Sequence, residues 1–407
     1  MRDSVDPREL DGLPYIGLEH IGESTLRLTG VGQASDVTST KSRFNAGDVL
    51  FGKLRPYFRK VVQPRFEGIC STDIWVLRPQ EGVSPDYLFY LMASPEVVEQ
   101  AIASSKGTRM PRADWKFVAD QRITLGPLEE QHRIASVLRA LDDRIELNRQ
   151  MCETLEEMAQ ALFKSWFVDF EPVRAKMEGR WREGESLPGL PAHLYNLFPD
   201  RLVDSELGPI PSGWRAAPLD ETASFTNGLA LQKFPAQPDG WLPVIKIAEM
   251  RRGYTERTDR CSSEINERYI INDGDLLFSW SGSLEVVFWS HGTGALNQHL
   301  FKVEPMGVPL WLCWLWLTHH LPSFRETASD RATTMGHIRR HHLNEALVAV
   351  PPIGIVNVLN PMIGNLVEQL ATGLVNARVL MRHRDTLLPK LISGEVRLPE
   401  VVEAVGC

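Results

Sequence analysis

Two short patterns have the residue types and spacing of a ligand site, and both are incomplete. Gly47–Lys53, GDVLFGK, has the G-x-x-x-x-G-K spacing in which backbone N–H groups and a lysine hold nucleotide phosphates. Leu54 stands where that motif needs a Ser or Thr for magnesium, so we interpret the segment as a turn entering a strand. His337 and His341 have the i, i+4 spacing of metal ligands on a helix, but no Cys or acidic partner stands at ligand spacing. We therefore expect a solvated basic face there, with no metal and no catalytic residue.

Basic residues are concentrated in two stretches of each half of the chain. Residues 41–65 contain seven Lys and Arg against one acid, and residues 106–116 contain four against Asp114 alone. Comparable clusters follow at residues 251–260 and 325–340. Any single run could be a solvated face, but clusters at matching places favour contacts with the phosphates of one extended polyanion. The candidates for such contacts are Lys53, Arg55, Arg59, Lys60, Arg109, Arg112, Lys116, Arg251, Arg252, Arg339 and Arg340.

Composition sets the outer limits. The chain has 407 residues, a formal net charge of −8, 43% hydrophobic and 24% charged residues, which excludes a disordered chain and a uniformly basic coat protein. Residues 129–170 hold nine acids and five bases, so the acid excess lies away from the basic clusters. Five scattered cysteines favour free thiols. Without a signal core or an apolar run near the ~20 residues that span a bilayer, we expect a soluble, cytoplasmic protein with no membrane contact.

The chain is predicted to be a duplication. PYIGLEHI, which begins at Pro14, resembles PVIKIAEM, which begins at Pro243, and GDVLF at Gly47 resembles GDLLF at Gly274. WVLRP ends at Pro79 and its counterpart FKVEP at Pro305, while Met110 corresponds to Met335. Because the separation of these matches is nearly constant, we predict two copies of one unit of about 225 residues.

Each copy is predicted to end in a long helix. Apolar residues from Ile134 to Trp166 follow the 4-3-4-3 spacing of a coiled-coil seam, and the same spacing recurs in the second copy from Leu359 to Leu391. At ~1.5 Å per residue the first helix would be roughly 58 Å long, too long to be buried in one globule. We predict that the two helices pair antiparallel, through Ile134, Leu138, Leu141, Ile145, Leu155, Leu162, Leu359, Ile363, Leu366, Leu370, Leu380 and Leu387.

The remaining segments predict an α/β fold of mixed α+β type. Runs such as DVLFGKL and HLFKVEP have strand character, and LWLCWLWL, from Leu310, is interpreted as a buried helix. Two globular domains would then be separated by the helix pair, with pseudo-two-fold symmetry. The predicted boundaries are 1–127 and 214–352 for the globules, 128–170 and 353–396 for the helices, 171–213 for a linker and 397–407 for a tail.

At this point the sequence resembles a known family. The segment from Pro127, PLEEQHRIASVLRALDDRIELNRQ, continuing to FEPVRAKMEGR, resembles the central helix and linker of the specificity subunit of type I restriction-modification systems. GDVLFGKLRPYFRKV, GICSTDIWVLRP, SWSGSL and LNQHLFKV resemble stretches of its two target-recognition domains. The resemblance covers nearly the whole chain. It implies a non-catalytic subunit that reads double-stranded DNA, holds two methyltransferase subunits and is joined by a restriction and translocase subunit.

The resemblance also carries expectations for the site. No cofactor is expected in this chain, whereas the partner subunits would bind S-adenosylmethionine, ATP and Mg²⁺. The recognised site would be bipartite and asymmetric, since Gly52–Arg55 is replaced by Ser279–Gly282, with half-site centres ~34 Å apart or slightly more. Arg reads guanine and Gln reads adenine most readily, so the candidate base readers are Arg55, Arg59, Arg109, Gln298 and Arg339.

One departure from the family leaves alternatives open. Only Met1–Leu13 precedes Pro14, a much shorter stretch than Gly213–Leu242 before Pro243, so we expect the first domain to lack its opening strand and turn. A methyltransferase-binding scaffold that has lost DNA reading is therefore one alternative. A nucleotide-binding enzyme at Gly47–Lys53 is the other.

Overall fold

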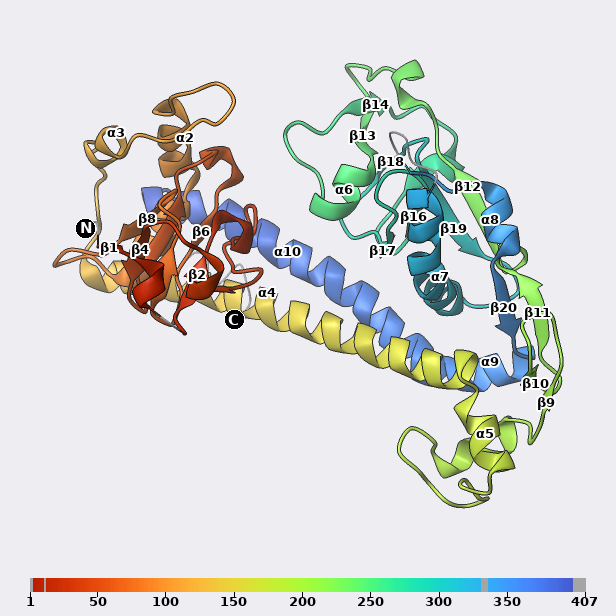
Figure 1. The fold of residues 1–407 in the computed structure, drawn as a ribbon. Coiled ribbons are helices and arrows are strands. Elements are labelled where there is room, and N and C mark those ends of the chain that lie inside the picture. Colours follow the sequence, from red (N-terminus) through yellow and green to blue (C-terminus); the bar gives the residue numbers. More distant parts are fainter. Residues whose placement is uncertain (1–2, 11, 331–335, 398–407) are drawn as a thin grey trace. The chain divides into compact units, whose positions relative to one another are not determined.

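Two long helices, α4 (Leu128–Phe163) and α10 (Asn365–Ser393), run through both of the units into which the fold divides (Figure 1). Unit 1 comprises Met1–Arg144 and Leu380–Cys407, and unit 2 comprises Ile145–Val379. The computed structural model describes residues 3–10, 12–330 and 336–397. The predicted mixed α/β class and the presence of two long helices are confirmed.

Unit 1 contains two small sheets. The first has the strand order β1-β4-β7-β2-β3, with β2 and β7 parallel, and the second has the order β6-β5-β8. Helices α1 (Pro85–Ala93) and α2 (Pro95–Ala103) each begin with a proline after a serine, the sequence that favours a helix start. The other elements are β1 (Ser4–Val5), β2 (Pro14–Ile16), β3 (Gly32–Gln33), β4 (Lys41–Phe44), β5 (Val49–Gly52), β6 (Val61–Val62), β7 (Gly68–Cys70), β8 (Ile74–Leu77) and α3 (Trp115–Ala119).

The core of unit 1 includes parts of both long helices. Ile134 and Leu138 of α4 and Leu388 and Leu391 of α10 are buried in one cluster with α1 and α2. Beside this cluster lies a buried ionic network centred on Arg384, whose side chain is 1% exposed. Its guanidinium donates to Asp142 of α4 at 2.8 Å and to the neighbouring Asp385 at 3.1 Å. Tyr90 of α1 also donates to Asp142, at 2.7 Å, and Arg59 donates to Asp385, at 3.0 Å.

Unit 2 contains two four-stranded sheets, β12-β19-β16-β17 and β14-β13-β18-β15, and two short pairs, β11-β20 and β10-β9. Strands β13 and β18 run parallel, as β2 and β7 do in unit 1. The strands are β9 (Leu202–Val203), β10 (Ile210–Pro211), β11 (Arg215–Pro218), β12 (Ala223–Asn227), β13 (Trp241–Ile245), β14 (Arg260–Ser262), β15 (Ile270–Ile271), β16 (Leu276–Ser279), β17 (Val286–Phe288), β18 (Gly294–Leu296), β19 (Leu300–Pro305) and β20 (Leu347–Val350).

Helix α7 (Leu310–Asp330) forms the centre of the unit 2 core, beside the sheet that contains β16 and β19 (Figure 1). Trp311–Leu317 are buried without exception, so the prediction of a buried helix for LWLCWLWL is confirmed. No helix in the described parts of the chain is long and apolar enough to cross a membrane. The remaining helices of this unit are α5 (Glu171–Met177), α6 (Ile247–Arg252), α8 (Arg340–Glu345) and α9 (Ile353–Leu359).

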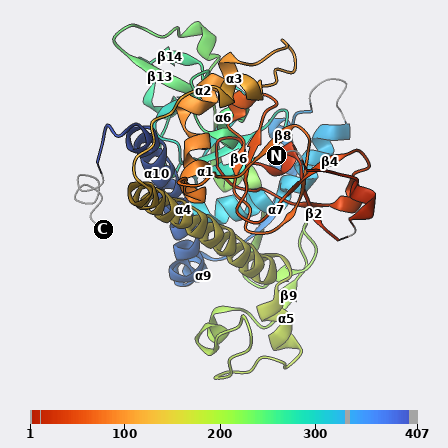
Figure 2. The ribbon, with the colours of Figure 1, turned by 90° about the vertical axis from the view of Figure 1, so that its left-hand side faces the viewer.

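The segment predicted to be a linker has its own packing. Between α5 and β10, the side chains of Trp181, Leu194 and Phe198 are buried, and the Trp166 indole donates to the Gly189 carbonyl at 3.1 Å. The ammonium of Lys176 lies 4.0 Å from the Tyr195 ring centroid. Both views show this lobe beyond the end of α4 (Figures 1 and 2). Pro and Gly therefore mark turns of an ordered lobe within the segment predicted to be the linker.

The predicted seam residues differ in burial. Seven are buried, namely Ile134, Leu138, Leu141, Leu155, Leu359, Ile363 and Leu370, whereas Ile145, Leu162, Leu366, Leu380 and Leu387 are partly exposed. The helical path is interrupted by π-helical turns at Lys164–Val168 and Asn360–Gly364. The second turn precedes α10 and shifts its buried face, so that Val367 is buried beside the predicted position Leu366. In α4, Phe163 is buried beside the predicted position Leu162.

Within unit 2, α4 and α10 approach each other closely at Gly373. A Cβ added there would lie 2.6 Å from the Cys152 sulfur, and the Cys152 thiol contacts the Leu370 carbonyl at 3.6 Å. Glycine is thus required by the close approach of a neighbouring helix. Cys70, Cys152, Cys261 and Cys313 are free and buried, while Cys407 lies outside the described residues.

We expect Gly373→Ala to destabilise the protein by about 1 kcal/mol or more, because overpacking outweighs the gain of about 1 kcal/mol in helix propensity. In a Cys152→Ala background, where space is available, the same change should stabilise the protein. Urea unfolding of the four variants measures this coupling. If Gly373→Ala stabilised both backgrounds equally, the close approach of the two helices would be contradicted.

Candidate nucleic-acid interface

In unit 1 the fold brings the two predicted basic stretches together. The loop after β5 pairs with the segment before α3 through an antiparallel bridge between Leu54 and Arg112. The Arg55 N–H donates to the Pro111 carbonyl at 2.8 Å, and the Ala113 N–H donates to the Lys53 carbonyl at 2.9 Å. Two segments that are distant in the sequence thus form one basic surface.

The candidate residues on this surface have different environments. Arg55, Arg109 and Lys116 are exposed, and Arg55 has a left-handed backbone with φ of 52°. Arg112 is exposed as well, but its guanidinium makes two hydrogen bonds to Asp73, at 2.9 and 3.1 Å, and this carboxylate raises the pKa of Arg112. It could still exchange that partner for a phosphate.

Two further candidates are engaged with the protein. The Arg59 side chain is 13% exposed and donates to the Ala93 carbonyl at 2.7 Å as well as to Asp385. Lys60 is half-buried and donates to the Leu18 carbonyl at 2.7 Å. Both side chains support the loop around Pro56–Phe58, whereas Lys53, also half-buried, lies at its start.

In unit 1, we expect the double variant Arg109→Ala, Lys116→Ala to weaken binding to duplex DNA of any sequence. Each phosphate contact contributes about 0.9 to the slope of log K against log salt, so the slope should fall by up to about 1.8. Fluorescence anisotropy of a labelled random duplex at several salt concentrations measures it. Arg133→Ala, an exposed arginine of the acidic α4, is the matched control and should leave the slope unchanged.

Unit 2 has a corresponding arrangement with different residues. An antiparallel bridge joins Ser281 to His337, and the Ile338 N–H donates to the Trp280 carbonyl at 2.9 Å. The Ser281 hydroxyl lies 3.2 Å from Nδ1 of His299. The loop after β16, the turn before β19 and the segment before α8 therefore meet at one place.

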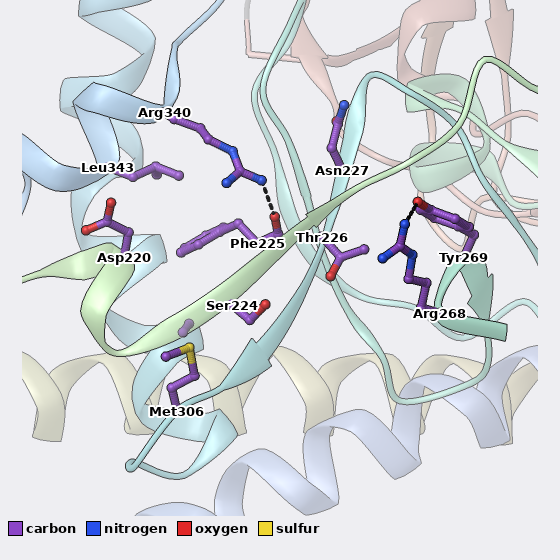
Figure 3. Close-up of a pocket in the computed structure, with 11 residues that line it drawn as sticks. Asp220, Ser224, Phe225, Thr226, Asn227, Arg268, Tyr269, Met306, Arg340 and Leu343 are labelled. Carbon is purple, nitrogen blue, oxygen red and sulfur yellow. Dashed lines mark hydrogen bonds between the residues drawn. The ribbon is translucent and has the colours of Figure 1, made fainter. Parts of the chain in front are cut away.

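The unit 2 candidates lie on and around this place. Gln298 is half-buried, with its amide nitrogen 3.3 Å from Nε2 of His299, and Arg339 is exposed. Arg340 is exposed as a whole but donates to the Phe225 carbonyl at 2.9 Å (Figure 3). Arg251 forms an ion pair with Glu285, which raises the pKa of Arg251, and Arg252 follows it at the end of α6.

Two adjoining hollows extend along β12 in unit 2. The larger, of about 480 Å³, is lined by strand residues Ser224–Asn227 together with Arg268, Tyr269 and Arg340 (Figure 3). The smaller, of about 310 Å³, is lined by Asn227, Trp280, Phe301 and His337 to Arg340. Asn227 and Arg340 line both hollows. Of the lining residues, sequence reasoning identified Arg339 and Arg340 as candidates for DNA contacts and His337 as part of an incomplete metal-ligand pattern. SWSGSL, which contains Trp280, was among the family-like stretches.

The phosphate-loop pattern has another structural role. Val49–Gly52 is a buried strand, which confirms the interpretation of GDVLF as a turn entering a strand. The N–H groups of Gly47, Gly52 and Lys53 donate to Pro64, Lys60 and Asp73 carbonyls, so they cannot cradle phosphates without breaking these bonds.

The histidine prediction needs a correction. His337 precedes α8, so it does not share a helix with His341. Instead His341, His342 and Glu345 bring three ligand atoms within 4.8 Å of one another, so the expectation that no acidic residue accompanies the histidines is wrong. Nδ1 of His342 accepts the Arg339 N–H at 3.1 Å.

Comparisons with known proteins agree with this arrangement. A family model described as the type I restriction modification DNA specificity domain matches residues 12–157. The type I restriction enzyme HindI specificity subunit of Haemophilus influenzae is 26% identical over 405 residues, covering 88% of each chain. The MjaIX specificity subunit of Methanocaldococcus jannaschii is 26% identical and covers 79% of this chain and 72% of that protein.

The fold is also similar to a solved structure. The type I restriction-modification S subunit from M. genitalium aligns over 96% of this chain and 93% of its own, with a TM-score of 0.52 and 15% identity. This likeness concerns the fold alone. The family match and the two curated relatives show that the sequence is similar to specificity subunits of type I restriction-modification systems.

Proposed function

We propose that this chain is the sequence-specific DNA-binding subunit of a type I restriction-modification complex, and that it recognises a bipartite, asymmetric site. The observation that carries the proposal is that both units join the same two segments at a basic surface. Leu54 bridges Arg112 in unit 1, and Ser281 bridges His337 in unit 2. Each unit would read one half of the site.

An internal repeat accounts for this correspondence. The parallel pair Tyr15–Ile69 matches Val244–Ala295, and the antiparallel pair Val49–Leu77 matches Leu276–Val303. Each residue in the two unit 1 pairs has its counterpart in the unit 2 pairs about 225 residues later in the chain. This separation is close to that of the sequence matches. These pairings support a duplicated recognition domain, within the boundaries given above for the globules, helices, linker and tail.

An antiparallel coiled-coil pair of α4 and α10 is the second structural part of the proposal. In unit 1, Asp142 pairs with Arg384, and in unit 2, Cys152 lies against Gly373. From the first contact to the second, the residue number increases from 142 to 152 on α4 and decreases from 384 to 373 on α10. An antiparallel pair of helices requires such opposite and nearly equal changes. Such a pair would act as a ruler for the spacing of the two half-sites.

In this role the chain performs no chemistry. The methyltransferase and restriction subunits would supply S-adenosylmethionine, ATP and Mg²⁺, and two methyltransferase subunits would bind along the helices. The bases of the target would be read by side chains in the two basic surfaces. The leading candidates are the exposed Arg55 and Arg109 in unit 1, and the half-buried Gln298 and the exposed Arg339 in unit 2. We propose that Arg59 and Lys60 position the loop instead.

Two measurements separate this proposal from its alternatives. Salt-dependent binding of the full chain to duplex DNA is expected, together with no ATP binding that depends on Lys53. A scaffold without DNA reading would bind methyltransferase subunits but not duplex DNA. ATP binding abolished by Lys53→Ala would instead favour the nucleotide-binding enzyme.

A further inference from the structure

We infer that the smaller hollow of unit 2 is a binding site for a single unstacked nucleobase of DNA, which would stack on the Trp280 indole. The inference rests on the proposed DNA-reading function and adds a ligand class and a site to it. The hollow measures about 310 Å³, at the lower end of the ~300–1,000 Å³ typical of small-ligand sites.

The walls of this hollow are aromatic. Of the residues that line it, Trp280 and Phe301 have ring centroids 6.2 Å apart and tilted rings, and the His337 ring meets the Trp280 ring edge to face, with centroids 6.5 Å apart. His299, outside the lining, lies against Trp280 with ring centroids 5.7 Å apart. The His337 bridge to Ser281 and the Ile338 N–H bond fix this side of the hollow against the Trp280 backbone. A base has two π-faces, so it can be stacked by such a wall whatever its identity.

One polar group at the rim is already oriented. The Trp280 indole N–H donates to Oδ1 of Asn227 at 3.1 Å, which fixes the amide and directs its NH₂ group elsewhere. An amide NH₂ donates readily to the ring nitrogen and carbonyl acceptors on a base edge. Asn227 is exposed at the end of β12, where a ligand can reach it.

Cationic side chains continue from the aromatic hollow into the larger one. Arg339 lines the first, Arg340 lines both, and Arg268, stacked 4.6 Å from the Tyr269 ring, lines the second. Against these three guanidinium groups, the described residues that line the two hollows include one acid, Asp220 (Figure 3). A groove that is cationic along its length and aromatic at its end matches a sugar-phosphate strand that carries an unstacked base.

The alternative ligand class, an extended peptide on the edge of β12, is less well matched. The Arg340 guanidinium already donates a hydrogen bond to the Phe225 carbonyl, which is one of the backbone groups that would have to pair with an added strand. The aromatic end of the groove also has no role in main-chain pairing. If the hollow bound a peptide instead, the test below would show no preference for the probe with an unpaired base.

The test uses the full chain and two labelled probes, an intact duplex and the same duplex with one unpaired thymine. Wild-type protein is expected to bind the bulged probe roughly tenfold more tightly, the contribution of about one stacked base. Trp280→Ala should abolish this preference while leaving affinity for the intact duplex, and Trp280→Phe should retain most of it. Trp241→Ala is the control, since it removes a different tryptophan of unit 2, which is exposed and whose ring centroid lies 3.9 Å from the Arg260 guanidinium carbon.

The outcomes are distinguishable. Equal binding of both probes by wild-type protein, or a preference that survives in Trp280→Ala, would overturn the inference and leave the proposed function standing. Binding of neither probe would overturn the proposed function itself. If Trp280→Ala failed to fold, the exposed variants Asn227→Ala and His337→Ala would decide, since each should reduce the preference several-fold, and an unchanged preference in both would overturn the inference.

Discussion

Deleting one heptad from each long helix, Arg149–Leu155 of α4 with Ala371–Ala377 of α10, is expected to shorten the spacer of the recognised site by about three base pairs. A heptad at ~1.5 Å per residue removes ~10 Å of helix, and each base pair occupies ~3.4 Å. The deleted segments face each other if α4 and α10 are antiparallel, and both lie within unit 2. The measurement is the methylated motif in cells that carry the variant together with its partner subunits.

A deletion from α4 alone is the matched control. This deletion shifts the apolar seam of α4 by one heptad relative to that of α10, so the interhelical contacts beyond it lose their register. We therefore expect the complex to fail to assemble, and we do not expect a motif with a shorter spacer. A double deletion that remains active with an unchanged spacer would refute the ruler, although not DNA reading itself.

Replacing Arg384 with Met should lower the free energy of unfolding by about 1–3 kcal/mol, because the change removes the buried guanidinium from the carboxylates of Asp142 and Asp385, whose side chains are 19% and 40% exposed. Burial lowers the pKa of Arg384, but the carboxylates of Asp385 and Asp142 outweigh this and raise it, so the guanidinium stays charged. Tyr90 and Arg59 also depend on these carboxylates. Equilibrium urea unfolding measures the loss.

Arg382→Met, an exposed position on the same helix, should change the stability by less than about 0.5 kcal/mol. Adding Asp142→Leu to Arg384→Met should restore part of the lost stability, since it removes the carboxylate that Arg384→Met leaves without its guanidinium partner. Equal effects at positions 382 and 384 would contradict the view that the ionic network holds α4, α10 and the first globule together.

The sequence predicts best where one physical pattern dominates. The long helices could be found because the apolar spacing persists over many turns, and the buried helix at Leu310 because its counterpart in the first half, YLFYLM after Pro85, is an ordinary helix start. GDVLF can be interpreted correctly because the second copy lacks the lysine that a phosphate loop needs. Charge clustering located the two surfaces, although it did not separate the exposed Arg109 from Arg59, whose side chain is only 13% exposed.

Long-range contacts explain what the sequence does not reveal. Arg384 lies between Leu380 and Leu387 at a position where the 4-3-4-3 spacing calls for an apolar residue, so the sequence alone indicates an unfavourable charge there. Only the fold shows that Asp142 and Asp385 neutralise it. The hollow at Trp280 is formed by segments around residues 227, 280, 301 and 337, whose meeting depends on the sheet topology. In unit 1, β6-β5-β8 has three strands among the described residues, whereas the unit 2 sheet adds β12, which lines both hollows.

The central claim, that this chain determines the DNA sequence that its complex modifies, is tested most directly by sequencing the methylated bases in cells that carry it with its partner subunits. The account predicts one bipartite, asymmetric motif that disappears when the chain is removed and that changes in one half when unit 2 is altered at Gln298 and Arg339. A methylated motif that is independent of this chain, or no motif in an assembled and folded complex, would contradict it.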